Sequence, residues 1–436
     1  MKKKLLIFTL IFAFCINAFT SFSFAAEKDE APKTTAQNML MINTNTGATI
    51  FEKSPDEKIY PASLTKMVTL LVAFDLITDY NQNVTVVEDC YDDLVVGSSN
   101  INLKEDEQMS VDDLMYAVAI SSANEAANML AIHLCTDTAT FIDKMNAKAA
   151  ELGATNTHFV NTHGLHDENH YTTARDMSLI AKAAFSNEKI FEYLSTPVHV
   201  IAPTNKTLTK RTLVTTNGLI YQNSGIYYKN CKAGKTGTTT PAGYNLVSLG
   251  QKGDIEFILV AMNVEKKSGG TNTVFSDTRT MYEWAFENYK SSKILSENEI
   301  IEEVSVHLSA KGDHLVLLPE KNTYSVIPID LDPTTLEREI VTEQEIFAPV
   351  KQGDKLGTIT LKKDGVTYAS VNLVAGSDVE RSAVLYYLYL IETFFKNPWV
   401  IAICIILAVL VVIYVIVMIS QNSRRRRKKL RRRIRF

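Results

Sequence analysis

The longest uninterrupted apolar runs lie near the two ends of the chain. At the N-terminus, Lys2-Lys3-Lys4 precedes an apolar run from Leu5 to Phe19, and Ser23-Phe24-Ala25 follows as a small-residue cleavage pattern. A basic start, a short apolar stretch and such a pattern are typical of a secretory signal peptide. We therefore expect residues 1–25 to be a cleaved signal peptide, with an uncleaved anchor as the alternative, and residues 26–37 to form a polar linker.

The second apolar run, Trp399 to Ile419, contains no charged residue. At about 1.5 Å per residue, a helix of this length spans about 30 Å, the thickness of a bilayer core. The pattern therefore predicts a transmembrane helix at 399–419, preceded by a juxtamembrane amphipathic segment at 379–398. Arg424 to Phe436 holds ten Lys or Arg residues and no acid, so residues 420–436 are predicted to be a basic cytoplasmic tail. A nucleic-acid-binding tail is the alternative.

Between these ends, the hydrophobic pattern predicts strands at both ends of residues 38–291 and helices between them. Met39 to Ile42 and Ala48 to Phe51 flank a turn and read as a hairpin. Tyr244 to Leu249 and Ile255 to Asn263 read as a second hairpin. Helical stretches are expected at Ala62–Thr78, Val111–Leu134, Asp143–Leu152, Thr173–Ser186 and Ser276–Tyr289. This order predicts an α/β (α+β) domain with one central sheet.

From about Ile294 the pattern changes to short β-like runs separated by Gly, Asp and Pro. The runs are Ile301–Leu308, His314–Leu318, Lys355–Leu361 and Thr367–Val374. Residues 292–378 are therefore predicted to form a small all-β domain.

Charge separates the two ends from the rest of the chain. The net charge of the 436 residues is −4. Without the ten positive charges of the tail and the three of Lys2-Lys3-Lys4, residues 26–423 carry −17. An acidic body argues against a nucleic-acid partner. Three cysteines, Cys90, Cys135 and Cys231, lie outside the apolar ends, and an odd number cannot all pair as disulfides.

The first chemical motif is Ser63-Leu64-Thr65-Lys66. Residues three apart on a helix share a face, so the serine hydroxyl and the lysine amine can meet. A lysine acts as a base only when it is neutral, which requires that burial or a nearby cation lower its pKa. The pattern alone is common, since Ser186-Asn187-Glu188-Lys189 repeats it. A capping serine beside a solvated lysine is the alternative.

The second motif is Ser122-Ala123-Asn124, which directly follows the apolar run Leu114 to Ile120. A buried helix that ends in polar residues can direct a hydroxyl and an amide into a cleft. Ser98-Ser99-Asn100 and two other triplets match the same pattern, so position alone favours Ser122. A turn or capping role is the alternative.

The third motif, Lys235-Thr236-Gly237, occurs once and is followed by the predicted strand from Tyr244. On an edge strand, the lysine and threonine can hold a carboxylate, and the glycine lets it approach the backbone. The backbone N–H groups of Thr238 and Ser63 can form an oxyanion hole. A glycine-rich turn is the alternative.

In this order and spacing, the three motifs resemble those of the penicillin-binding and serine β-lactamase superfamily. The wider context is similar to the low-molecular-mass D-alanyl-D-alanine carboxypeptidases of serine peptidase family S11. The resembling stretches are Ile59–Met67, Ile120–Ala127, Phe159–Leu165, Lys235–Thr239 and Ala242–Tyr244. The resemblance implies a β-lactamase/transpeptidase-like domain with a central antiparallel sheet, then a small β domain and a membrane attachment. Many members use an amphipathic anchoring helix, whereas this chain is expected to span the membrane.

The resemblance also implies the reaction and its residues. Ser63 would attack the carbonyl of the penultimate D-alanine of a peptidoglycan stem peptide, with Lys66 as its base. Ser122 and Asn124 would relay the proton and hold the peptide. Lys235 and Thr236 would bind the terminal carboxylate, and Gly237 and Thr238 would complete the substrate-binding residues. The expected partners are stem peptides, β-lactam antibiotics and the lipid bilayer, with no nucleic acid and no cofactor. The catalytic domain would lie outside a bacterial cell membrane.

Two alternative functions and one alternative site remain. A β-lactamase of the same superfamily is the first, although no E-x-x-x-N element stands out between Leu152 and Lys189. A non-catalytic β-lactam receptor or cell-wall scaffold is the second. His163, His166, Asp167 and His170 suggest a metal site, but their spacing is not that of a helical H-E-x-x-H motif, and no metal is expected.

Overall fold

The computed structural model describes residues 30–265 and 273–433. The predicted signal peptide therefore lies outside the described residues, as do residues 26–29 of the linker and 434–436 of the tail. The chain divides into two compact units. The first runs to Ile294 and includes Tyr324–Leu336 and Lys362–Ala369, and the second contains the remaining residues.

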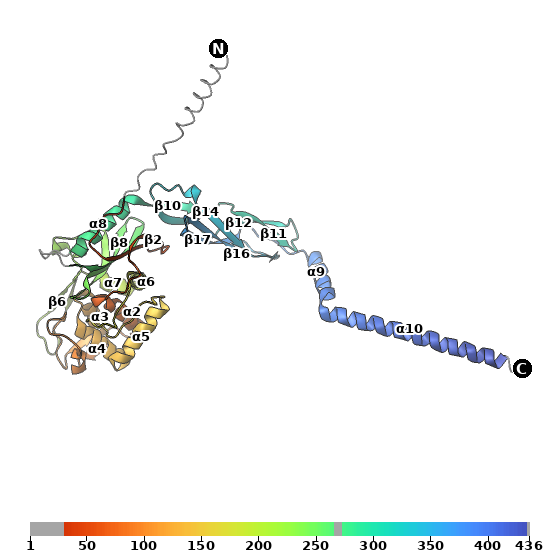
Figure 1. Ribbon diagram of the computed structural model, residues 1–436, viewed down its shortest axis with the longest axis horizontal. Coiled ribbons are helices and arrows are strands. Elements are labelled where there is room, and N and C mark those ends of the chain that lie inside the picture. Colours follow the sequence, from red (N-terminus) through yellow and green to blue (C-terminus); the bar gives the residue numbers. More distant parts are fainter. Residues whose placement is uncertain (1–29, 266–272, 434–436) are drawn as a thin grey trace, which may run out of the picture. The chain divides into compact units, whose positions relative to one another are not determined.

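A five-stranded antiparallel sheet forms the centre of the first unit (Figure 1). Its order is β2 (Thr49–Lys53), β1 (Asn38–Asn43), β9 (Ile255–Val264), β8 (Gly243–Lys252) and β7 (Cys231–Thr239). Both predicted hairpins are present, because β1 pairs with β2 and β8 pairs with β9. The strand that carries the third motif, β7, lies at one edge of the sheet. The prediction of one central antiparallel sheet is confirmed.

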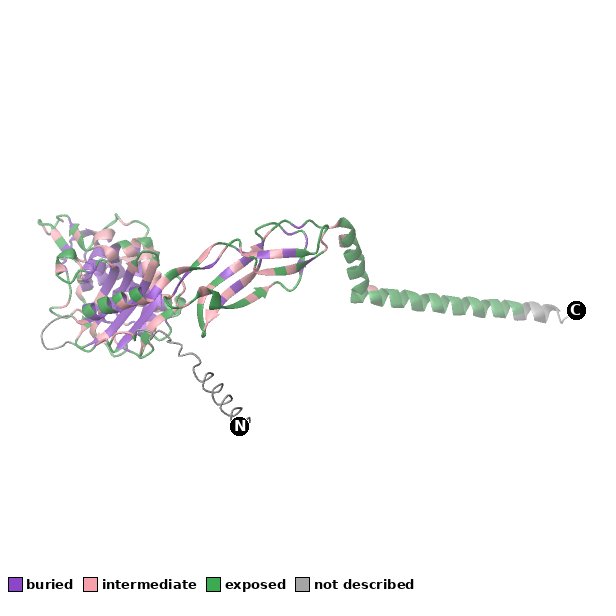
Figure 2. Ribbon diagram, turned by 90° about the horizontal axis from the view of Figure 1, so that it is seen from above, coloured by how far each residue is buried: buried purple, intermediate pink, exposed green. Residues whose placement is uncertain are grey.

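Both faces of this sheet are covered, and β1 shows why. All six of its residues are buried. Because side chains alternate along a strand, Leu40 and Ile42 pack into one apolar cluster and Met39 and Met41 into another. The first cluster includes residues of the central helices, and the second includes residues of α8 (Thr273–Asn288). The result is a three-layer domain whose buried residues concentrate in and around the sheet (Figure 2).

Six helices cover the motif-bearing side of the sheet. They are α2 (Lys66–Leu76), α3 (Val111–Ile120), α4 (Asn124–Cys135), α5 (Thr138–Glu151), α6 (Ala174–Ser186) and α7 (Glu188–Ser195). The predicted helix from Val111 to Leu134 is wrong as one element, because it breaks between Ile120 and Asn124. The predicted helix from Ala62 begins as a short 3₁₀ turn, η1 (Ala62–Thr65), before α2. Helix α5 starts earlier than predicted because the Asp137 side chain accepts a hydrogen bond from Thr140 N.

Smaller elements complete the first unit. They are the hairpins β3 (Asn83–Thr85) with β4 (Gln108–Ser110) and β5 (Val198–Ile201) with β6 (Arg211–Val214), and the 3₁₀ turns η2 (Glu88–Tyr91) and η3 (Gln222–Ser224). A further two-stranded sheet pairs β10 (Tyr289–Leu295) with β13 (Thr323–Pro328), and η4 (Pro333–Thr335) follows it.

Most residues of a six-stranded sheet belong to the second unit. Its order is β14 (Glu337–Thr342), β16 (Lys355–Lys363), β17 (Val366–Ala375), β12 (His314–Pro319), β11 (Glu302–His307) and β15 (Ile346–Phe347). The four β-like runs of the sequence coincide with β11, β12, β16 and β17. Strands β14 and β15 were not predicted, because charged residues interrupt the first and the second is two residues long.

Two helices follow this sheet, α9 (Ala383–Lys396) and α10 (Pro398–Arg433). Residues Pro398–Arg426 form a helix long and apolar enough to cross a membrane, and its most apolar 18-residue stretch has a mean hydropathy of 3.6. The large apolar residues of α9 and α10 are mostly exposed (Figure 2). The helix is longer than the predicted span of 399–419, because the basic residues that follow continue it.

Candidate active site

Ser63 lies in η1, on a backbone held in an unusual conformation. The preceding residue, Ala62, has a φ of 50°, which non-glycine residues rarely adopt. Gly164 packs against this turn. A Cβ added at Gly164 would lie 1.9 Å from the Ala62 carbonyl oxygen, and Gly164 itself has a φ of +88°. A glycine is therefore required for the loop after His163 to pack against the turn that carries Ser63.

Lys66 is the first residue of α2, and its amine contacts the hydroxyl group of Ser63. Its Nζ is 3.2 Å from Ser63 Oγ, 2.6 Å from Asn124 Oδ1 and 2.7 Å from the His163 carbonyl oxygen. The side chain is completely buried. Burial, reinforced by the positive charge of Lys235, holds the pKa of Lys66 well below its usual value. A neutral amine that contacts a serine hydroxyl is suited to accept its proton.

The break between α3 and α4 brings the second motif to the same place. Ser122 has a φ of 59°, which turns the chain sharply before Asn124 begins α4. Two backbone bonds hold the turn: Ala123 N donates to Ala117 O, and Asn124 N donates to Ser99 O. The turn buries both Ser122 and Asn124.

The third motif approaches from the edge of the sheet. Lys235 is 1% exposed, and its Nζ donates to Ser122 Oγ at 2.9 Å and to the Thr236 carbonyl at 2.9 Å. Burial lowers the pKa of Lys235 to about 7. A Cβ on Gly237 would lie 3.0 Å from Ser63 N and 2.8 Å from Pro61 O. The glycine thus allows β7 to lie against the backbone of the nucleophile turn.

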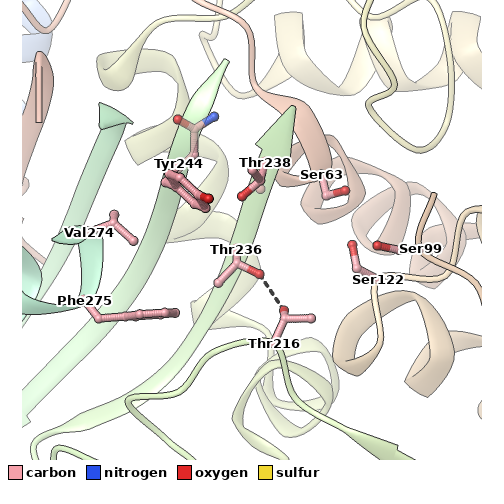
Figure 3. Close-up of a pocket in the computed structure, with 11 residues that line it drawn as sticks. Ser63, Ser99, Ser122, Thr216, Thr236, Thr238, Tyr244, Val274 and Phe275 are labelled. Atoms are coloured by element: carbon pink, nitrogen blue, oxygen red, sulfur yellow. Dashed lines mark hydrogen bonds between the residues drawn. The ribbon is translucent and has the colours of Figure 1, made fainter. Parts of the chain in front are cut away.

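The three motifs meet at one pocket (Figure 3). Among the predicted residues, Ser63, Ser122, Thr236, Gly237 and Thr238 line it. Lys66, Asn124 and Lys235 lie beneath the lining and contact it through the hydrogen bonds given above. The structure therefore brings together all eight predicted residues, which come from η1, α2, the α3–α4 turn, α4 and β7.

Six further lining residues were not predicted: Ser99, Thr216, Tyr244, Asn245, Val274 and Phe275. Tyr244 ends the stretch Ala242-Gly243-Tyr244 and Asn245 follows it, so their presence near the site could have been inferred from sequence. Ser99 belongs to the triplet Ser98-Ser99-Asn100, which the sequence did not favour, and its carbonyl accepts a hydrogen bond from Asn124 N. Thr216, Val274 and Phe275 carry no motif that could have identified them.

The histidines of the suggested metal site have separate partners. His163 Nε2 pairs with Asp93 Oδ1 at 3.1 Å, and His170 Nε2 lies 2.7 Å from Thr65 Oγ1. The ring of His166 packs edge-on against Tyr60. Among the described residues no group of three His, Cys, Asp or Glu side chains could hold a metal ion. His163 and His170 instead anchor the loop that presents the His163 carbonyl to Lys66.

Comparison with known proteins agrees with this geometry. Residues 25–266 match the profile of the D-alanyl-D-alanine carboxypeptidase family, and residues 289–381 match that of the penicillin-binding protein 5 C-terminal domain. The chain is 28% identical over 391 residues to D-alanyl-D-alanine carboxypeptidase DacF of Bacillus subtilis, covering 88% of this chain and 97% of that protein. It is 30% identical over 384 residues to DacA of Haemophilus influenzae, covering 84% and 92% respectively.

Solved structures give the same result. The crystal structure of penicillin-binding protein 5 from Haemophilus influenzae superposes with a TM-score of 0.66 at 28% identity, covering 80% of this chain and 99% of that one. A serine and two buried lysines that converge on one pocket, and a match that extends over both units, lead to one conclusion. The chain belongs to the D-alanyl-D-alanine carboxypeptidase family and has the architecture of penicillin-binding protein 5.

Proposed function

We propose that this protein is a serine-type D-Ala-D-Ala carboxypeptidase that uses Ser63 as its nucleophile. Its substrate is the pentapeptide stem of peptidoglycan, from which it releases the terminal D-alanine. The single observation that carries the proposal is the position of Lys66. A fully buried amine with a depressed pKa lies 3.2 Å from the Ser63 hydroxyl, which is the arrangement that proton abstraction requires.

Acylation follows from this contact. Ser63 Oγ attacks the carbonyl carbon of the penultimate D-alanine while its proton moves to Lys66 Nζ. The developing oxyanion is stabilised by the backbone N–H groups of Ser63 and Thr238. The peptide C–N bond then breaks, and the departing nitrogen takes a proton from Lys66 relayed by Ser122. The close approach of Gly237 to Ser63 N supports this placement of the oxyanion hole.

Deacylation repeats the proton transfers with water. Water attacks the ester carbonyl and gives its proton to Lys66, the bond to Ser63 Oγ breaks, and Ser63 recovers its proton. The product is a stem peptide one residue shorter. Asn124 holds Lys66 through both steps, since its Oδ1 accepts from Nζ at 2.6 Å. Penicillin acylates Ser63 by the same route, because its ring carbonyl occupies the place of the scissile peptide.

The terminal carboxylate of the substrate binds on the side of β7. Lys235 supplies a positive charge beneath the pocket while its Nζ is protonated, and the hydroxyl groups of Thr236 and Thr238 face the ligand. All three residues lie on β7, which is an edge strand of the central sheet among the described residues. This arrangement favours a substrate that ends in a free carboxylate.

The membrane attachment completes the proposed function. A helix with an 18-residue stretch of mean hydropathy 3.6, followed by a run of arginines, supports a single-pass anchor, with the tail in the cytoplasm and the catalytic unit outside. An acidic catalytic unit tethered outside a bacterial membrane is suited to an immobile polymeric substrate. In this arrangement residues 1–25 act as the signal peptide.

Release of D-alanine from a synthetic pentapeptide that ends in D-Ala-D-Ala tests the proposal directly. We expect one D-alanine per peptide for the native protein and none for Ser63→Ala. We also expect slow turnover of penicillin. A β-lactamase, the alternative function, would instead release penicilloate rapidly. Rapid penicillin turnover without D-alanine release would reverse the assignment.

A further inference from the structure

We propose that Thr216 is a positioning residue for the substrate carboxylate, acting through Thr236. This inference rests on the proposed function and adds a residue to its carboxylate site. Thr216 lies outside the three motifs, in the segment between β6 and β7. Figure 3 shows its side chain directed at Thr236 inside the pocket, on the side opposite Ser63.

The contact itself is a hydroxyl–hydroxyl hydrogen bond. Thr216 Oγ1 lies 2.5 Å from Thr236 Oγ1. In such a pair one hydroxyl donates to the other, and the second proton remains free to donate outward. A carboxylate accepts hydrogen bonds and cannot donate them, so it is bound by the hydroxyl that points its proton into the pocket. Each bond in the chain polarises the next. Thr216 therefore fixes the rotamer of Thr236 and strengthens it as a donor.

The backbone around Thr216 contacts the end of α3 and strand β7. Its N–H donates to the carbonyl of Ile120, two residues before Ser122. The next residue, Asn217, is fully buried and packs against β7, where a Cβ on Gly234 would lie 2.7 Å from its Nδ2. Thr216 thus sits between the end of α3 and the strand that carries Lys235. In this position Thr216 connects the elements that carry the second and the third motif.

The distribution of charge around the pocket explains why the hydroxyl groups of Thr216 and Thr236 are important for binding the carboxylate. The residues that line the pocket, in the part of the chain that the structure describes, carry hydroxyl, amide and apolar side chains. The lysine nearest to Thr236 is Lys235, which is buried and already donates to Ser122 Oγ and Thr236 O. Hydroxyl groups above a buried ammonium group are then the direct contacts of the carboxylate. Loss of one of them weakens binding of an anionic ligand selectively.

The test compares benzylpenicillin with its methyl ester on the full-length protein. Both acylate Ser63, and only the acid presents a carboxylate. For Thr216→Val we expect the second-order acylation constant with the acid to fall about fivefold, the effect of losing one hydrogen bond between neutral groups, and that with the ester to stay within about twofold. Thr216→Ser keeps the hydroxyl and should retain the native preference. Thr212→Val, an exposed threonine on β6, is the matched control.

With the pentapeptide, the loss in Thr216→Val should appear mainly in KM, with kcat changed little. Thr216→Ala serves as a second variant if the valine disturbs folding. An equal loss on the acid and the ester, no loss on either, or failure of Thr216→Ser to restore activity would each overturn the inference. Failure of the proposed function gives a different result, because the native protein would then release no D-alanine.

Discussion

Two buried lysines define the chemistry at the scale of single residues. Lys66 and Lys235 lie on different elements, yet each is almost inaccessible to solvent and each has a depressed pKa. Burial is the largest cause for both, and the charge of Lys235 further disfavours protonation of Lys66. In the proposed mechanism the two lysines have different roles: Lys66 serves as the base, and Lys235 binds the substrate carboxylate and disfavours protonation of Lys66.

Removal of the Lys235 charge should shift the pH dependence of acylation. Protonated Lys235 makes protonation of Lys66 harder, so Lys235→Gln raises the pKa of Lys66. Because only neutral Lys66 accepts the Ser63 proton, the acidic limb of the acylation profile should move to higher pH. Stopped-flow acylation by an ester-type β-lactam, which lacks the carboxylate that Lys235 binds, measures this limb. A limb that stays in place or moves to lower pH would show that Lys235 does not influence the base.

The sequence identified these two lysines but not all of their partners. Motif order and spacing were sufficient to nominate Ser63, Lys66 and Lys235. The acceptor on the other side of Lys66 is a backbone carbonyl, that of His163, and no side-chain pattern reveals a carbonyl. Thr216 was missed for a related reason, since it reaches the pocket through a tertiary contact with Thr236 and belongs to no motif.

At the scale of elements, the site depends on interruptions of regular structure. The 3₁₀ turn at Ala62, the break at Ser122 and the loop at Gly164 all contain residues with positive φ. The strands of the two central hairpins could be predicted from short apolar runs that flank turns, because a sheet covered on both faces buries consecutive residues. The break at Ser122 could not, since the apolar, alanine-rich run on both sides favours a continuous helix. Tertiary bonds from Ala123 and Asn124 decide its position.

Substitution of Gly164 should disable the nucleophile turn. Gly164→Ala places a Cβ against the Ala62 carbonyl and requires an unfavourable φ, so we expect a loss of more than about 2 kcal/mol of stability. Acylation of the folded fraction should also fall. Gly253→Ala is the matched control, because it has a φ of +61° but no atom within 4 Å of the added Cβ. Thermal unfolding compares the two, and equal losses would mean that backbone strain alone, without the clash, explains the effect.

At the scale of the whole molecule, charge and hydropathy divide the chain into an acidic part, an apolar helix and a basic end. Residues 26–423 are strongly acidic, whereas the end of α10 is a run of arginines and lysines. These features could be read from the sequence alone, because they depend on composition. The bounds of the β strands in the second unit could not be read in full, because β14 and β15 are short or charged and gain their order from neighbouring strands.

Truncation should separate anchoring from catalysis. Removal of residues 398–436 deletes α10 and leaves α9. The side chains of Leu388, Ile391 and Phe395 on α9 are exposed in the intact protein. We expect this form to associate weakly with membranes, and a form that ends at Ser382 to be recovered in the soluble fraction with unchanged penicillin acylation. Membrane fractionation and vesicle flotation measure both. A soluble full-length protein, or a form ending at Ser382 that still sediments with membranes, would refute the anchor.

The most direct test of the account is the location of the covalent intermediate. After brief exposure to benzylpenicillin, mass spectrometry of the intact protein and of its peptides should reveal one penicilloyl group, attached to Ser63. The adduct should be absent from Ser63→Ala and should form much more slowly in Lys66→Met. An adduct on Ser122 or Ser99, or a native protein that acquires none, would contradict the assignment of Ser63 as the nucleophile.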